Sequence, residues 1–267
     1  MKQLSPRRDW PPSWRTSFDY DQLELYGKRA HLGYTYAYAN RRDRTLQLLK
    51  SAGLPAGATV LDVAAAQGNF SLLLAEMGFD VTWNDLREEL ADYVRLKHEA
   101  GRVSFVPGNI FELSFPQRFD AILATEVIEH VAHPDDFLRR LRELARPDGC
   151  IIVTTPNGRY FRNTLPPFSQ ITDPAALEAI QFRPDADGHL FLLRAEELQD
   201  LAAKAGLQVE KLLLFTNSLT IGHVKLEPML RVLPRRLVET LERASSALPT
   251  ALSHRLLVHL GARLRPL

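Results

Sequence analysis

Short apolar segments alternate with segments of helical periodicity along the centre of the chain, and this alternation constrains the fold more than any other feature of the sequence. The segments predicted as strands are residues 59–64, 80–83, 103–106, 121–124, 150–155 and 207–215. The segments predicted as helices are residues 70–77, 88–98, 134–145 and 195–205. Strands and helices that alternate in this way indicate an α/β fold, in which a mostly parallel, doubly wound sheet carries helices on both faces. Such sheets bind ligands at the carboxyl ends of their strands.

The two flanks differ from this centre and divide the chain into three regions. Residues 1–58 are predicted to be an N-terminal arm and helical cap, with residues 1–19 as an irregular arm. Residues 59–215 are predicted to be the ligand-binding domain. Within it, residues 158–190 contain prolines and lack a helical period, so they are predicted to be a substrate-side insertion over the site. Residues 216–267 mix Leu and Val with Arg and are predicted to be a C-terminal extension of amphipathic helices.

Net charge and cysteine usage limit the partners and the location of the protein. The formal net charge is +1, but both flanks are basic and the centre is acidic. Basic amphipathic helices at the C-terminus predict contact with an anionic membrane surface or with a second copy in a homodimer. The near-zero overall charge and the lack of a recognisable RNA-binding module argue against a nucleic-acid partner. The single cysteine, Cys150, and the lack of an apolar span predict a cytoplasmic location, at most peripheral to a membrane.

Polar and very small residues follow the predicted strands where a ligand is expected. The first strand runs into Ala64-Ala65-Ala66-Gln67-Gly68, a turn of small residues that lets a ligand approach the backbone at a helix N-terminus. The second strand ends at Asp85, whose carboxylate can accept two hydrogen bonds from a ribose diol. Asn109 follows the third strand and could contact an adenine edge. Each of these motifs is a weak signal by itself, and only the combination is specific for a family.

The combination resembles class I S-adenosylmethionine (SAM)-dependent methyltransferases, in the branch of the ubiquinone-biosynthesis O-methyltransferases and the small-RNA 2′-O-methyltransferases. The matching motifs are Leu61-Asp62-Val63 with Gly68, Asp85, Asn109-Ile110, residues 126–130 (Glu-Val-Ile-Glu-His), Pro147-Asp148-Gly149 and Thr155-Pro156-Asn157. The resemblance implies a Rossmann-like sheet of seven strands with SAM across the strand ends. The cofactor-binding residues that it implies are Asp62, Ala64, Ala66, Gly68, Asp85, Leu86, Asn109, Ile110, Thr125 and Glu126.

The first loop departs from the family pattern, which usually has glycines where this chain has Ala64 and Ala66. An alanine at a positive φ costs about 1 kcal/mol, so the loop must avoid such angles or accept strain. Asn109 stands where the family often has Asp, and its amide retains a donor and an acceptor. In similar methyltransferases the segment before the first strand folds over the cofactor. An arginine in that segment, here Arg41, Arg42 or Arg44, often meets the methionine carboxylate or an anionic substrate.

A cluster of titratable residues follows the fourth strand. Glu126, Glu129 and His130 have the spacing i, i+3, i+4, which places them on one face of a helical turn. The resemblance adds His189, from the downstream Asp187-Gly188-His189, so these four residues are candidate ligands of a divalent metal such as Mg²⁺. Three alternatives stay open: a metal site, a metal-free site in which His130 and His189 act as base and substrate orienter, and a purely structural cluster.

The chemistry of methyl transfer favours an oxygen acceptor. The cofactor supplies an activated methyl group, so the protein must mainly align and deprotonate the acceptor. A hydroxyl needs a base or a metal, and this cluster offers both. We therefore expect a bacterial-type methyltransferase (EC 2.1.1.-) that O-methylates a small molecule such as a sugar, a quinone precursor or another natural-product-like acceptor. The alternatives are 2′-O-methylation of a terminal ribose in RNA and a SAM-binding protein without catalysis.

Overall fold

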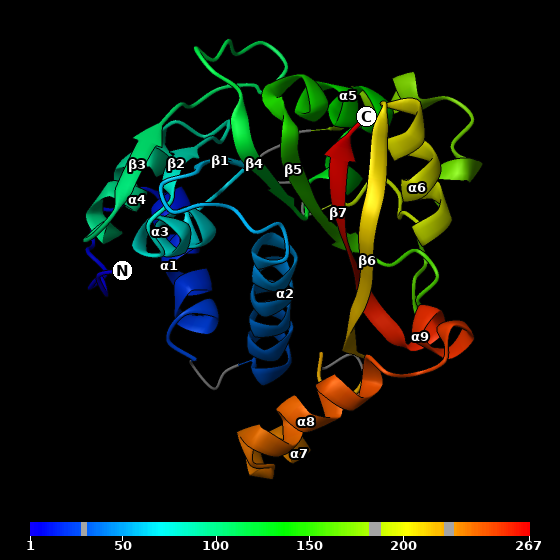
Figure 1. Ribbon diagram of the computed structural model, residues 1–267. Helices are drawn as coiled ribbons and strands as arrows, with labels where there is room; N and C mark the ends of the chain where they lie inside the picture. Colours follow the sequence, from blue (N-terminus) through cyan, green and yellow to red (C-terminus); the bar gives the residue numbers. More distant parts are fainter. Residues whose placement is uncertain (28–30, 182–187, 222–226) are drawn as a thin grey trace.

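The computed structural model describes residues 1–27, 31–181, 188–221 and 227–267. Within these residues, seven strands form one sheet with the order β3-β2-β1-β4-β5-β7-β6 (Figure 1). The strands are β1 (Thr59–Val63), β2 (Asp80–Trp83), β3 (Arg102–Phe105), β4 (Phe119–Thr125), β5 (Ala145–Pro156), β6 (Leu207–Asn217) and β7 (Leu257–Pro266). The first five strands are parallel, and β7 runs antiparallel to both of its neighbours. The predicted Rossmann-like, mostly parallel sheet of seven strands is confirmed.

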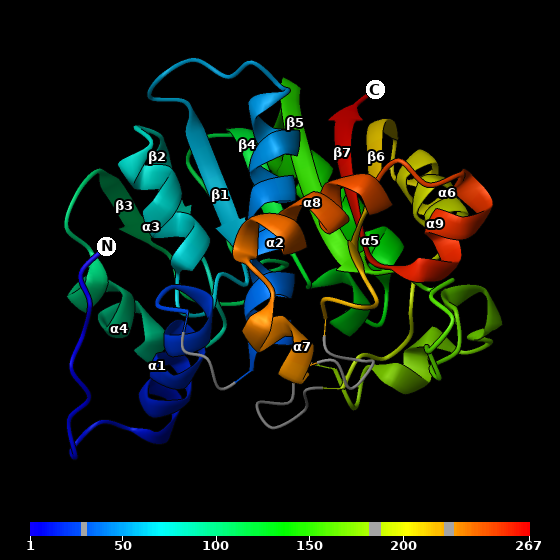
Figure 2. The same ribbon diagram turned by 90° about the horizontal axis from the view of Figure 1, so that it is seen from below.

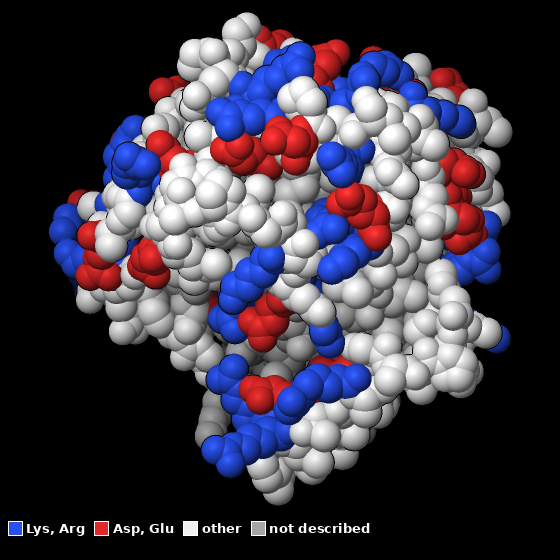
Figure 3. Space-filling model, viewed as in Figure 1, with Lys and Arg blue, Asp and Glu red and all other residues white. Residues whose placement is uncertain are grey.

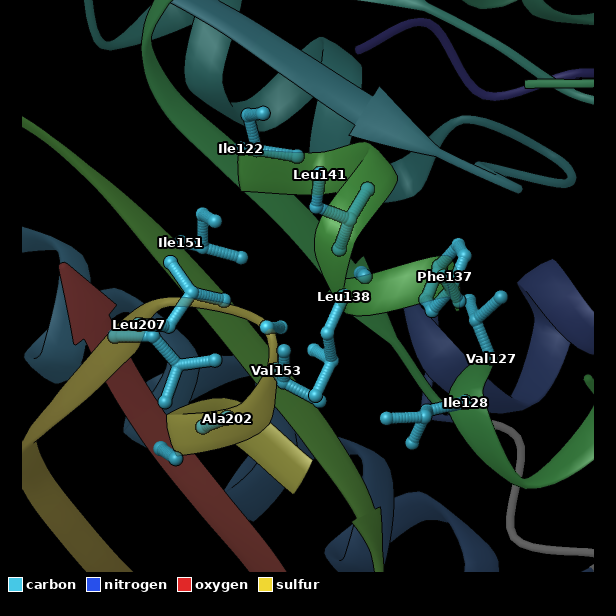
Figure 4. Packing of buried hydrophobic residues seen from close by; sticks show 14 of the residues in the cluster. Ile122, Val127, Ile128, Phe137, Leu138, Leu141, Ile151, Val153, Ala202 and Leu207 are labelled. Atoms are coloured by element: carbon cyan, nitrogen blue, oxygen red, sulfur yellow. The ribbon is translucent and has the colours of Figure 1, made fainter. Parts of the chain in front are cut away.

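Helices cover both faces of the sheet, as predicted (Figures 1 and 2). On one face, α2 (Leu32–Lys50) and α3 (Asn69–Glu76) pack on residues of β1, β4 and β5. Helix α4 (Glu89–Lys97) packs on Trp83 of β2 beside them. On the other face, α5 (Pro134–Leu144) and α6 (Ala195–Lys204) bury the largest apolar cluster (Figure 4).

Local sequence explains the start of two helices that position the site. Pro134 opens α5, and Asp135 and Asp136 lie in its first turn, where acidic side chains complement the helix dipole. Helix α3 begins after Gly68, which has φ 71°. A Cβ atom at Gly68 would lie 2.7 Å from the side chain of Val94. Glycine is therefore required there both for the backbone angle and for the close packing of α3 on α4.

The N-terminal segment is more ordered than expected, because residues 12–19 belong to helix α1 (Pro12–Glu24) and are not an irregular arm. Trp14 packs edge-on against Tyr93 of α4, with ring centroids 5.8 Å apart. Asp21 and Lys97 form an ion pair of 2.8 Å, and each is 1% exposed. These tertiary contacts stabilise α1 on α4, and its sequence alone has only a weak apolar stripe.

The C-terminal region corrects the prediction of helices throughout residues 216–267. Helices α7 (Glu227–Val232), α8 (Arg235–Ser245) and α9 (Thr250–Leu256) are present, but residues 257–266 form β7 between β5 and β6. Alternate residues Leu260, Ala262 and Leu264 are fully buried in the core. A short mixture of Leu and Arg fits both helical and strand periods, so pairing with two distant strands decides the outcome. The sheet therefore extends almost to the last residue.

Helices α7 and α8 pack on the cap, where Leu230 and Val238 contact Leu32 of α2. The segment 158–190 contains the short 3₁₀ helices η2 (Phe168–Gln170) and η3 (Pro174–Leu177), and its residues 182–187 lie outside the described residues. None of the described helices is both long and apolar enough to cross a bilayer.

Candidate active site

A cavity of about 1090 Å³ lies at the carboxyl ends of the parallel strands, and β1 and β4, between which the strand order reverses, both contribute to it. Its walls come from α1, α2, the loops after β1 to β4, residues 162–165 and β7. Single small-molecule sites usually measure about 300–1,000 Å³. The cavity therefore has room for a cofactor and for part of a second molecule.

One side of the cavity is called the cofactor side here, because the sequence predicts cofactor-binding residues there, and it holds most of them. Those that line the cavity are Asp62, Ala64, Ala66, Asp85, Leu86, Asn109, Ile110, Thr125 and Glu126. Gly68 does not line it, and the contact that the structure gives this position is the packing against Val94. The strand-by-strand prediction thus brings together side chains from four successive strand ends.

The alanine loop, residues 64–68, contains two alanines with strained, positive φ angles. Ala64 has φ 52° and Ala66 has φ 48°, both in the left-handed region. Hydrogen bonds hold Ala66 on both sides: its amide donates to Asp85 Oδ2 (2.8 Å), and its carbonyl accepts from Trp83 Nε1 (3.0 Å). These two bonds, each worth about 1 kcal/mol, offset the cost of the positive φ.

Two buried carboxylates on this side already have partners within the fold. Asp85, with a side chain 4% exposed, accepts from the backbone and side-chain nitrogens of Arg87 at 2.9 Å as well as from Ala66. Asp62 Oδ2 accepts from the Ser71 hydroxyl at 2.5 Å, and burial raises the pKa of Asp62 to about 7. The cofactor side is therefore pre-organised.

The acceptor side brings together three of the four candidate metal ligands. Ligand atoms of Glu129, His130 and His189 all lie within 4.8 Å of one another, and the two imidazole centroids are 5.0 Å apart. Glu129 is fully buried; its Oε2 accepts from the Thr155 hydroxyl (2.9 Å). Its Oε1 has no hydrogen-bond partner in the described part of the chain and lies 3.9 Å from His189 Nε2. Burial, together with nearby Glu126, raises the pKa of Glu129 well above its usual value.

Glu126 does not join this group, which corrects the prediction that it shares a helical turn with Glu129 and His130. It has φ 56° and lies between β4 and the 3₁₀ helix η1 (Ile128–His130). Its Oε1 accepts from the Thr154 hydroxyl (2.8 Å). Burial opposes its charge, but His259 and Arg41 hold the pKa of Glu126 below its usual value.

Several lining residues come from segments for which the sequence analysis named no site residue or left a choice. Of the three arginines considered in the cap, Arg41 lines the cavity, whereas Arg42 and Arg44 do not. Glu24 of α1 accepts from Tyr34 (2.7 Å) of α2 and from Gln67 (2.9 Å) of the alanine loop. His259 lines the cavity from β7. No local signal in the sequence marks Glu24 or His259, because the tertiary fold alone brings them to the cavity.

Comparisons with known proteins agree with this geometry. A family model described as a methyltransferase domain matches residues 32–212. Ubiquinone biosynthesis O-methyltransferase from Azorhizobium caulinodans is 39% identical over 110 residues, which are 38% of this chain and 41% of that protein. The protein of the same name from Pseudomonas paraeruginosa is 28% identical over 179 residues, covering 66% of this chain and 75% of that protein. The first of these curated relatives are matched over less than half of their own length.

A solved structure extends the likeness to nearly the whole chain. Magnesium protoporphyrin IX methyltransferase from Synechocystis PCC 6803, solved with bound SAH, has a TM-score of 0.54 at 13% identity. The superposition covers 96% of this chain and 93% of that one. At this level of identity the likeness shows a shared fold.

Proposed function

Because this chain belongs to the methyltransferase-domain family, we propose that it transfers the methyl group of SAM to a hydroxyl group of a small-molecule acceptor. The observation that carries the choice of oxygen is the pair of imidazoles, His130 and His189, beside the buried Glu129 at the far side of the cavity. An amine acceptor needs only to be neutral, whereas a hydroxyl needs a group that removes or polarises its proton. The relatives named as ubiquinone biosynthesis O-methyltransferases support the same acceptor class.

The pre-organised side of the cavity is proposed to hold SAM. Asp85 faces the ribose diol, and Asn109 and Ile110 border the adenine. The alanine loop and the cap residues Glu24 and Arg41 enclose the methionine part. The cofactor supplies a sulfonium methyl group for in-line displacement. The chain's own task is to exclude water with α1 and α2 and to orient the acceptor hydroxyl toward this end of the cavity.

His130 is proposed as the group that takes the acceptor proton, with His189 as the orienting partner. Both imidazoles line the cavity, so both can reach a bound acceptor. An imidazole has an ordinary pKa of about 6.5, which suits a general base near neutral pH. The carbonyl of Gly188 lies 3.3 Å from His130 Nδ1 and orients the ring.

As an alternative to a metal-free base, we propose that Glu129, His130 and His189 hold a divalent metal. The partnerless Oε1 of Glu129, close to two imidazoles, fits such a group, because a buried carboxylate oxygen without a partner is costly. Two nitrogen ligands and one oxygen ligand favour Mn²⁺, Fe²⁺ or Zn²⁺ over Mg²⁺. The metal would polarise the acceptor oxygen.

Metal binding is tested without activity. Calorimetric titration of the protein with MnCl₂ and MgCl₂ is expected to give at least about tenfold tighter binding of Mn²⁺. The Glu129→Gln variant is expected to lose that binding, whereas Glu178→Gln, on the surface, keeps it. If millimolar Mn²⁺ does not bind the parent protein, the metal is rejected and His130 acts as a metal-free base.

The acceptor class is tested with labelled SAM and a panel of acceptors. The panel contains 3,4-dihydroxybenzoate and its alkyl esters, a hexose glycoside, a primary amine and a short RNA with a free 3′-terminal ribose. We expect methyl ethers of a small hydroxylated acceptor, detected by mass spectrometry. Methylation of the amine alone, or of the RNA alone, would contradict the proposal.

The outer face of α7 and α8 is proposed to lie on an anionic membrane surface. Met229, Val232, Leu237 and Leu241 are 41, 83, 45 and 40% exposed. Exposed arginines lie on the same two helices, at positions Arg231, Arg235, Arg236 and Arg243, and Arg235 pairs with Glu239. Figure 3 shows basic side chains, a few acidic ones and uncharged ones over the lower part of the molecule, where these helices lie in Figure 1. Apolar side chains within a basic surface are typical of peripheral membrane contacts. The buried free thiol of Cys150 is compatible with a cytoplasmic location.

Vesicle sedimentation tests this surface. Binding is expected with phosphatidylglycerol vesicles, not with phosphatidylcholine alone, and Val232→Asp should abolish it. Failure to bind anionic vesicles would overturn the membrane contact, and a dimer in light scattering would then identify a second copy as the occupant.

A further inference from the structure

The carboxylate of Glu126 lies between two cationic or polar side chains that come from opposite ends of the chain. Arg41 Nη1, in α2, is 3.7 Å from Glu126 Oε2, and His259 Nε2, in β7, is 3.8 Å from the same oxygen. The other oxygen, Oε1, is held by Thr154 of β5. One carboxylate at the end of β4 is thus surrounded by the cap, the centre of the sheet and the C-terminal strand.

Packing fixes the position of the His259 imidazole beside Glu126. It is 7% exposed, and its ring stacks on Phe215 of β6, with centroids 5.4 Å apart and planes 19° apart. In the sheet it lies opposite Pro156 of β5 and Phe215 of β6. The antiparallel insertion of β7 between these strands is what brings this imidazole to the floor of the cavity.

The distances leave Glu126 able to bind a ligand. Hydrogen bonds from nitrogen to oxygen span about 2.7–3.2 Å, so at 3.7 and 3.8 Å neither Arg41 nor His259 uses a lone pair of Oε2. The Glu126 side chain is 18% exposed and lines the cavity together with both neighbours. Arg41 and Glu126 therefore present a cation and an anion side by side, which matches the carboxylate and the ammonium of an α-amino acid.

We propose that His259 is a positioning residue that holds Glu126 for the ammonium group at the methionine end of the cofactor, while Arg41 faces the carboxylate of that end. The inference rests on the proposed use of SAM and adds the C-terminal strand to the cofactor site. Loss of the imidazole removes the polar partner that lies at ion-pair distance, 3.8 Å, from Glu126 Oε2. The carboxylate can then turn away, and the amino-acid part of the ligand loses its partner. The nucleoside part, on Asp85 and Asn109, is unaffected.

Calorimetry with two ligands tests the proposal without an acceptor. S-Adenosylhomocysteine carries the amino-acid part, and 5′-methylthioadenosine lacks it. His259→Phe, which preserves the stacking on Phe215, is expected to weaken S-adenosylhomocysteine binding about tenfold and to leave 5′-methylthioadenosine binding unchanged. His259→Gln, which retains a polar side chain beside Glu126 Oε2, should stay within about threefold of the parent protein. In a Glu126→Gln background, His259→Phe should have no further effect.

Three results would overturn the proposal. His259→Phe could bind S-adenosylhomocysteine as tightly as the parent, it could weaken both ligands equally, or it could act independently of Glu126→Gln. Each would leave His259 as a packing residue. A failure of the proposed O-methylation is seen separately, as normal cofactor binding without transfer to any hydroxyl.

Discussion

The carboxylates at the proposed nucleoside end of the cavity differ from the buried carboxylate on the acceptor side in how far the fold supplies their hydrogen-bond partners. On the cofactor side, Asp62 and Asp85 accept hydrogen bonds from Ser71, Ala66 and Arg87. On the acceptor side, Glu129 Oε1 has no partner among the described residues. Buried polar groups without partners are costly, and a ligand held between Glu129 and the two imidazoles would complete this one. The difference indicates that the proposed nucleoside end is built in advance, whereas Glu129, like Glu126 at the proposed methionine end, is completed by what binds there.

The largest expected effect comes from the acceptor side. His130→Ala should lower kcat about 10²–10⁴-fold, because it removes the proposed general base or metal ligand, while SAM affinity stays within about threefold. Steady-state kinetics with the best acceptor and calorimetry with SAM measure the two quantities. His133→Ala is the matched control, since His133 pairs with Glu178 and does not line the cavity. A large loss of SAM affinity in His130→Ala would contradict the assignment of His130 to the acceptor side.

The next effect comes from the cofactor side. Asp85→Ala should weaken SAM binding about 100-fold or more. The change removes the two charge-assisted hydrogen bonds that Asp85 is proposed to accept from the ribose hydroxyls, each worth about 1.5–3 kcal/mol. Calorimetry measures the affinity, and circular dichroism checks the fold. Glu88→Ala, an exposed change in the same loop, serves as the control. Unchanged affinity in Asp85→Ala would show that β2 does not carry the ribose.

The buried carboxylate Asp62 allows a test of pre-organisation by pH. Burial raises its folded pKa to about 7, well above the ordinary pKa of an aspartate, so the folded protein holds this proton more tightly than the unfolded chain. Its contribution to stability is complete below about pH 4 and is lost as the pH rises through 7. In urea unfolding, Asp62→Asn should therefore lose less stability than the parent between pH 5 and 7, by about 2 kcal/mol. Parallel curves for the two proteins would contradict the buried, titrating carboxylate.

The smallest effect concerns the strained loop of the cofactor side. Ala66→Gly should stabilise the protein by about 0.5 kcal/mol, because relief of a positive φ slightly exceeds the entropy that glycine adds to the unfolded chain. Ala65→Gly, at a neighbouring position without a positive φ, should instead destabilise by about 0.5–1 kcal/mol. Thermal unfolding measures both. Destabilisation of similar size in the two variants would mean that Ala66 carries no strain.

Elements defined by a local sequence pattern could be predicted, whereas those defined by long-range pairing could not. Strands β1 to β6 follow a local pattern of strand, loop and helix, so Asp85 and Asn109 could be placed at strand ends from the sequence, and the resemblance to methyltransferases added Asp62. Strand β7 could not, because its short Leu and Arg pattern is ambiguous until β5 and β6 pair with it. His259 was missed for that reason. The prediction that Glu126 and Glu129 share a helical turn was wrong, because Glu126 has a positive φ and lies outside the helical turn.

The account is tested most directly by the stoichiometry of a single turnover. Protein in excess over SAM with a labelled methyl group is mixed with the best hydroxylated acceptor, quenched and analysed by mass spectrometry. The account predicts S-adenosylhomocysteine and a methyl ether in equal amounts, with the label on the acceptor oxygen. S-Adenosylhomocysteine without a methyl ether, a label on nitrogen or carbon, or intact SAM after prolonged mixing with every hydroxylated acceptor would contradict it.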